Sequence, residues 1–83
     1  MKVINYKYFD LYLDENKRVV KIVVTKSCVE LIAIKDAIKL LQLRKEDREV
    51  PFIVKNKEIT IKATDTFEEA ADRFLLATPN VEL

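Results

Sequence analysis

Residues 16–30 of this chain read NKRVVKIVVTKSCVE, a stretch that indicates a turn, a strand and the start of a helix. β-branched residues at most positions between 19 and 25 favour a strand. Ser27 and Glu30 form a capping-box pattern, in which the serine hydroxyl accepts from the glutamate N–H and the carboxylate accepts from the serine N–H. A strand that leads directly into a capped helix is therefore predicted.

The same order of signals returns in residues 56–69, which read NKEITIKATDTFEE. Thr66 and Glu69 form the second capping box. A further strand-like run precedes each stretch, and the alternation of the first run changes phase, so that a one-residue bulge is expected there. The predicted strands cover residues 2–13, 18–26, 50–55 and 58–63, and the predicted helices cover residues 28–43 and 67–77.

This element order predicts an α+β domain of two layers, with both helices on one face of a four-stranded sheet. Val81–Leu83 would make a fifth, short strand. The long first hairpin, the helix that follows Val24-Thr25-Lys26-Ser27, the charged loop and the second hairpin resemble the β-grasp layout of ubiquitin-like proteins across residues 2–63. The resemblance implies a β-grasp-like sheet, and two strand-strand-helix units in tandem are the alternative.

Size and composition describe one small globular domain covering residues 1–83. A chain of 83 residues is too short for two hydrophobic cores. Hydrophobic residues make up 49% and charged residues 35%, a balance typical of soluble proteins. No run approaches the roughly eighteen apolar residues of a membrane span, so we expect an intracellular, cytoplasmic protein.

Three residue counts exclude most catalytic and cofactor chemistry. The chain has no histidine, no glycine and one cysteine. Zinc sites, Ser-His-Asp triads and Cys-His dyads therefore cannot be assembled. Phosphate-binding loops and dinucleotide fingerprints need glycine for close backbone approach. We expect no enzyme activity, no metal and no cofactor.

Two apolar surfaces favour a protein partner or self-association. The apolar positions of the helix at 28–43 span about half of its circumference, more than one neighbour covers. The strand at 18–26 is apolar on both sides, so it is central or meets a partner. The expected outcome is a binding module that forms a homo-oligomer or binds another protein. The candidate interaction residues are Val19, Val23, Ile32, Leu40 and Leu43.

Nucleic-acid binding is the first alternative. The run at 2–13 holds four of the seven aromatic residues among lysines, and aromatic rings with cations on a sheet face bind single strands. Ordinary packing of these rings is the competing interpretation, and acidic Asp10 and Glu58 on the same face would count against the hypothesis. The candidate contacts are Tyr6, Lys7, Lys21, Lys55 and Lys62.

A thiol or redox role for Cys28 is the second alternative. Cys28 is predicted at the first helical position, where backbone N–H groups and the helix dipole stabilise a thiolate. Thr25-Lys26-Ser27-Cys28 with the later Val50-Pro51 resembles a glutaredoxin locally, which implies a redox cysteine. Leu31 occupies the position of that family's second cysteine. A buried, unreactive thiol is the favoured interpretation.

Overall fold

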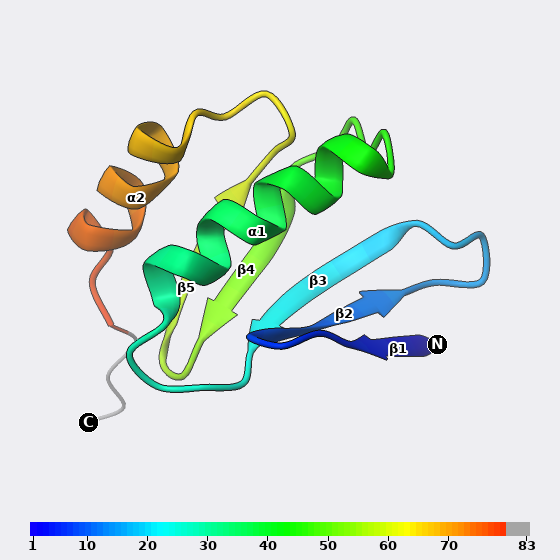
Figure 1. Cartoon of the computed structure of the whole chain (residues 1–83), viewed down its shortest axis with the longest axis horizontal. Coiled ribbons are helices and arrows are strands. Elements are labelled where there is room, and N and C mark those ends of the chain that lie inside the picture. The colour runs from blue at the N-terminus through cyan, green and yellow to red at the C-terminus, as the bar shows by residue number, and fades with distance from the viewer. Residues whose placement is uncertain (80–83) are drawn as a thin grey trace.

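The computed structural model describes residues 1–79 and contains one five-stranded mixed sheet with two helices (Figure 1). The strands follow one another across the sheet in chain order. Only the β3–β4 pair is parallel, and the other pairs are antiparallel. The elements are β1 (Lys2–Asn5), β2 (Phe9–Leu13), β3 (Val19–Val24), α1 (Glu30–Leu43), β4 (Val50–Val54), β5 (Lys57–Ile61) and α2 (Phe67–Leu76).

The predicted α+β class and two-layer arrangement are confirmed. Both helices lie on one face of the sheet (Figure 1), and a single core forms between the layers. Alternate residues of β2, β4 and β5 point into this core because successive side chains of a strand face opposite sides. The largest fully buried side chains are Phe52, Leu11, Ile22, Ile34, Leu41, Ile61 and Val50.

The predicted single strand at 2–13 is wrong, because the chain reverses direction within it. The Tyr6 N–H donates to the Phe9 carbonyl at 2.9 Å, and β1 then pairs antiparallel with β2. The change of phase in the alternation therefore marks a turn rather than a bulge. This turn supplies the fifth strand, whereas the proposed strand at 81–83 lies outside the described residues.

The order of the strands corrects the β-grasp expectation. In a β-grasp sheet the first strand of the N-terminal hairpin lies beside a strand that follows the helix. Here β3, the strand directly before α1, pairs in parallel with β4, directly after it. The β2–β3–α1 and β4–β5–α2 segments are consequently two strand-strand-helix units side by side, which is the tandem alternative, with β1 added at the edge.

The two predicted capping boxes have different outcomes. α2 begins as expected, with the Thr66 hydroxyl accepting from the Glu69 N–H at 3.1 Å. α1 begins two residues later than predicted, and its N-cap is Val29 without a side-chain cap. Cys28, which has a φ of 63°, belongs to the turn before the helix. The Ser27 box does not form because the chain is still turning at these residues.

Without glycine, other residues adopt the left-handed conformation at the turns. Lys17, Lys45 and Lys55 have φ values of 63°, 54° and 50°. Each such residue costs roughly 1–2 kcal/mol relative to the right-handed region. At the β2–β3 turn the Asp14 carboxylate offsets part of this cost by accepting from the Asn16 and Arg18 N–H groups.

A buried carboxylate anchors the charged connection between α1 and β4. Glu46 is only 8% exposed and accepts from the Val19 N–H and Arg48 Nε, each at 3.1 Å. Arg18 lies 3.9 Å from the same carboxylate. Burial alone would raise the pKa of Glu46, but these hydrogen bonds and the two arginine charges outweigh it and lower the pKa.

α2 is held against β5 by polar contacts as well as by its apolar face. Arg73 Nη1 donates to buried Asp65 at 2.9 Å and to the Thr60 carbonyl at 2.7 Å. Lys57 Nζ donates to the Phe74 carbonyl at 2.9 Å and lies over the Phe74 ring. The outer face of α2 is therefore presented in a defined orientation. Within residues 1–79, no helix is long and apolar enough to span a membrane.

Candidate functional site

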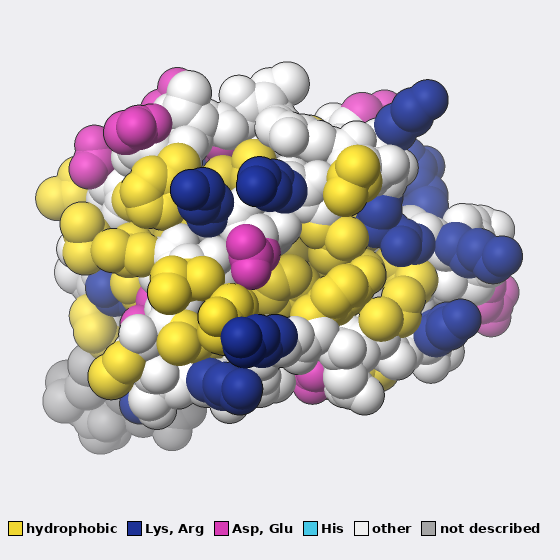
Figure 2. Space-filling model, in the orientation of Figure 1, with side chains coloured by type: hydrophobic (Ala, Val, Ile, Leu, Met, Phe, Trp, Pro, Cys, Tyr) yellow, Lys and Arg dark blue, Asp and Glu magenta, His cyan; other side chains and the backbone are white. Residues whose placement is uncertain are grey.

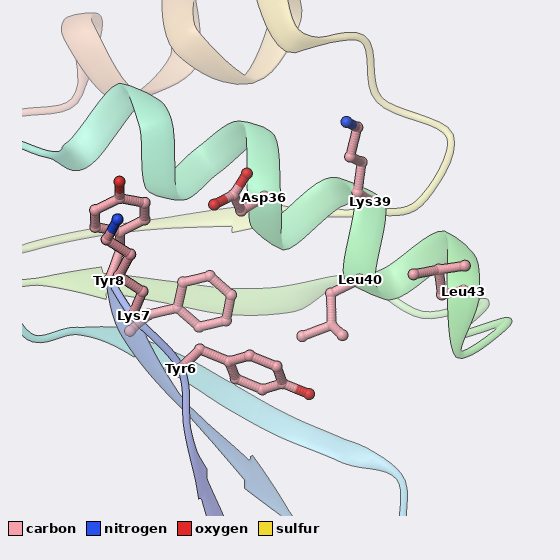
Figure 3. A pocket seen from close by; sticks show the side chains of 8 residues that line it. Tyr6, Lys7, Tyr8, Asp36, Lys39, Leu40 and Leu43 are labelled. Carbon is pink, nitrogen blue, oxygen red and sulfur yellow. The ribbon is translucent and has the colours of Figure 1, made fainter.

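An apolar groove runs between α1 and the turn that joins β1 to β2 (Figure 3). Its cavity volume is about 250 Å³. Leu40 points from α1 towards this turn, the Tyr6 ring lies beneath Leu40, and Leu43 lies at the end of the helix. The lining residues, which we call the groove, are Tyr6, Lys7, Tyr8, Phe9, Asp36, Lys39, Leu40 and Leu43.

The wide apolar arc of α1 explains why the groove is open. One side of the helix packs on the sheet through Ile34, Ala37 and Leu41. A second side faces α2 and the connection that precedes it, where Gln42 Nε2 donates to the Ala63 carbonyl at 2.9 Å. The third side has only the short β1–β2 turn as a neighbour, so Leu43 remains 81% exposed. The arc that the sequence shows to be too wide for one neighbour is thus only partly covered by two.

Aromatic rings form the wall of the groove opposite α1. The Tyr6 and Phe9 ring centroids lie 5.3 Å apart in a tilted arrangement, which suits the aromatic quadrupoles. Lys7 and Lys26 both lie over the Tyr8 ring, at 5.4 Å and 5.9 Å. The wall therefore combines rigid apolar surface with two ammonium groups at its edge.

The rim of the groove carries a positive balance. Lys7, Lys26 and Lys39 lie around it, and Asp36 is the acidic lining residue. All four are exposed, so their charges stay available to a partner. Figure 2 shows the resulting surface, an apolar strip over the α1 side of the molecule with Lys and Arg side chains above and below it.

The five predicted interaction residues separate into three places. Leu40 and Leu43 line the groove, and Ile32, which is 50% exposed, lies on the same stripe of α1 two turns earlier. Val19 is 3% exposed and belongs to the core, so it offers no surface. Val23 points to the other side of the sheet. The sequence did not associate Tyr8 or Phe9 with these leucines, although the phase change beside them marked the turn.

The sheet face away from the helices is uncovered within residues 1–79. Asp10, Val23, Ile53 and Glu58 follow one another across four strands on this face. Both acidic residues named as evidence against nucleic-acid binding therefore lie on it. Lys21 also lies there, with its Nζ 4.7 Å from the centre of the Tyr12 ring.

The predicted nucleic-acid contacts do not gather on one surface. Tyr6 and Lys7 line the groove on the helix side of the molecule. Lys55 lies in the β4–β5 turn, and Lys62 follows the end of β5. Of the five candidates, Lys21 is the one on the central strand of the open face. These five residues therefore do not form one continuous surface of aromatic rings and cations to which a single strand could bind.

A second cavity, of about 420 Å³, lies where the β2–β3 turn meets the end of α1. Cations dominate its lining, but Arg18 pairs with Asp47 at 3.3 Å and Arg44 donates to the Lys17 carbonyl at 3.4 Å. Cations at a helix C-terminus also stabilise the helix dipole. These side chains have structural roles at this end of the molecule. The lining consists of Asn16, Lys17, Arg18, Arg44, Lys45 and Glu46.

Cys28 is exposed, which corrects the favoured prediction of a buried thiol. It precedes the first residue of α1 by two positions, so it does not occupy the predicted helical position. The sequence contains no second cysteine. Among residues 1–79 there is also no group of three or more potential metal ligands.

Comparison of the chain with protein-family models, with curated proteins and with solved structures found no match. The groove and the surface around it are therefore interpreted from their own chemistry.

Proposed function

We propose that this chain is a small, non-enzymatic protein-binding module, and that the groove receives an apolar segment of a partner that also carries acidic side chains. The observation that carries the proposal is the open apolar groove itself. Leu43 and Tyr6 are exposed beside partly buried Leu40, and cations surround them. Contiguous apolar surface with a polar rim is typical of protein interaction sites.

The size of the groove favours side chains of a protein over a free small molecule. Pockets for small ligands are generally about 300–1,000 Å³, and this groove holds about 250 Å³. Burying a leucine or phenylalanine side chain contributes about 1.5–3 kcal/mol. One or two such anchors, with tyrosines as their neighbours, would form the energetic centre of an interface.

The charges around the groove specify the partner's polar residues. Lys7, Lys26 and Lys39 lie at the rim, where exposed charges guide encounter and select orientation more than they add affinity. A segment with aspartate or glutamate beside its apolar residues would be attracted. A basic segment would be repelled. Binding is expected to weaken with added salt, since exposed ion pairs are screened.

Selection of peptides from a random displayed library tests this function. We expect enriched peptides that combine leucine, isoleucine or phenylalanine with acidic residues. Nuclear magnetic resonance of the chain with such a peptide should show amide shift changes concentrated at residues 6–9 and 36–43. The absence of any enriched acidic and apolar sequence, or shifts centred on Val23 and Ile53, would contradict the proposal.

Two leucines on α1 provide a matched pair of variants. Leu43→Gln alters the groove, whereas Leu31→Gln alters an exposed leucine in the first turn of the same helix, outside the groove. Glutamine retains good helix propensity, so neither change should unfold α1. We expect Leu43→Gln to weaken peptide binding about tenfold, the loss of one buried apolar anchor, and Leu31→Gln to leave it unchanged. Equal effects of the two variants would place the binding site elsewhere.

A further inference from the structure

We infer that a second copy of this chain is one occupant of the groove, docking through the outer face of its α2 helix to give head-to-tail association. This inference rests on the proposed function of the groove. The docking surface, which we call the α2 face, consists of Glu68, Asp72, Leu75 and Leu76.

The α2 face combines apolar and acidic side chains, which is the composition proposed for a partner of the groove. Its four residues are spaced four, seven and eight positions from Glu68, so they share one side of the helix. Leu75 and Leu76 are 63% and 83% exposed. Both acidic side chains are exposed one or two turns before them. Buried Ala70 lies on the other side of α2 and packs into the core, and both leucines remain exposed.

The two surfaces match in charge and in apolar content. The acids of the α2 face can approach Lys7 and Lys39 at the groove rim, while the leucines contact Leu40 and Leu43. Seven residues of helix, the separation of Glu68 and Leu75, span about 10 Å. Figure 2 shows acidic side chains over the α2 side of the molecule and basic side chains around the apolar strip.

The charge distribution along the sequence supports a pairing of unlike surfaces. Residues 1–45 contain ten basic and five acidic residues, a net charge of +5, whereas residues 46–83 contain five basic and nine acidic residues, a net charge of −4. The first segment includes the whole groove and the second includes α2. Contact between the groove of one copy and α2 of another brings the oppositely charged halves together.

The positions of the two surfaces determine the symmetry. The groove uses the flank of α1 with Asp36 and Leu40, and α2 lies beyond the other flank, next to β5 (Figure 1). Polar contacts of Arg73 and Lys57 hold α2 there, so it cannot reach the groove of its own chain. Two different surfaces that meet in this way make a heterologous contact, which propagates into chains unless it closes into a ring. The α2 face presents only four side chains, and a contact of this size implies weak, concentration-dependent association.

Sedimentation velocity over a wide concentration range tests the inference with two variants that each lose one surface. Leu43→Gln removes the groove anchor, and the paired change Leu75→Gln with Leu76→Gln removes the apolar part of the α2 face. We expect the unaltered chain to form dimers and larger species at the highest concentrations, and each variant alone to be monomeric. An equimolar mixture of the two variants should form dimers and no larger species, because only one intact groove and one intact α2 face are present.

Charge reversal provides a second, independent readout. Lys39→Glu and Asp72→Lys should each reduce association, and a chain that carries both changes should recover it, since the pair of charges is exchanged. Leu31→Gln is the control that should change nothing. Circular dichroism of every variant shows whether the fold is retained.

Each other outcome has a defined meaning. A chain that stays monomeric at the highest concentration while it still binds a selected acidic peptide in the groove overturns this inference and leaves the proposed function in place, with another protein as the occupant. A closed dimer that persists in both leucine variants overturns the head-to-tail arrangement. Association with no dependence on Leu43 overturns the inference and, if peptide binding is equally insensitive, the proposed function too.

Discussion

Replacing Glu46 by glutamine should destabilise the whole domain, because this carboxylate joins three segments of the chain. It accepts from the Val19 N–H of β3 and from Arg48 beside β4, each at 3.1 Å, and the Glu46 N–H donates to the Leu41 carbonyl of α1 at 3.0 Å. Its side chain is 6% exposed. The amide of glutamine keeps the size of the side chain but removes the charge, and its NH₂ group cannot accept from a donor.

The magnitude follows from which contacts are buried. A hydrogen bond to a charged group contributes about 1.5–3 kcal/mol, and the bond from the buried Val19 N–H falls in this range. Arg48 and Arg18 are about half exposed, so water screens their attraction and each adds at most about 1 kcal/mol. We expect a loss of about 2–3 kcal/mol, equivalent to a decrease in Tm of roughly 10–20 °C for a domain of this size.

The effect should depend on pH in a defined direction. The folded-state pKa of Glu46 is lowered from an ordinary value of 4.5, so its contribution to stability is present above that value and is lost as the pH falls through the folded-state pKa. The difference between the original chain and Glu46→Gln should therefore be complete at neutral pH and should shrink in acid. Urea denaturation followed by circular dichroism at neutral and acidic pH measures both differences.

Glu58→Gln provides the control, since Glu58 is exposed on the open sheet face. Its substitution should change stability by less than about 0.5 kcal/mol. A Glu46→Gln variant as stable as this control would refute the anchoring role of Glu46. A loss that is equally large in acid and at neutral pH would refute its electrostatic origin.

Three further substitutions or reactions test local features. Thr66→Ala should cost about 1 kcal/mol, measured as a lower Tm, because the Glu69 N–H loses its N-cap acceptor; an unchanged Tm would contradict the cap. Lys45→Gly should raise the free energy of unfolding by up to about 1 kcal/mol, measured as a higher Tm, since glycine adopts the observed φ of 54° without a Cβ clash; a lower Tm would show that the strain is compensated. Exposed Cys28 should react with a thiol reagent as fast in the folded chain as in urea, whereas a folded-state rate about tenfold higher would favour the thiol hypothesis.

Local patterns predicted most elements of this fold with boundaries within about two residues, a difference as small as that between methods of assigning helix ends. β4, β5 and α2 are set by clean alternation or by a capping box whose residues are neighbours in the sequence. The failures are instructive in physical terms. A change of phase in the alternation of apolar residues, as in residues 2–13, is compatible with either a bulge or a turn. Only the pairing of β1 with β2 shows that a turn forms here.

Other failures arise because a local signal competes with tertiary contacts. Ser27 has the right spacing to cap a helix, but the connection from β3 to α1 uses that residue in a turn. Glu46 lies in a run of charged residues that has no apolar anchor. It is buried because donors from β3 and Arg48 converge on it, which sequence spacing does not reveal.

The sequence by itself determined the class of the fold, the lack of histidine and glycine, and the fact that α1 carries more apolar surface than one neighbour covers. These properties depend on composition and on short-range periodicity. Only the tertiary structure decided where the excess surface lies. Strand order places α2 on one flank of α1 and the short β1–β2 turn on the other, so that Tyr6 meets Leu40 across more than thirty residues of sequence. Such long-range contacts depend on the pairing of strands, and they created the groove.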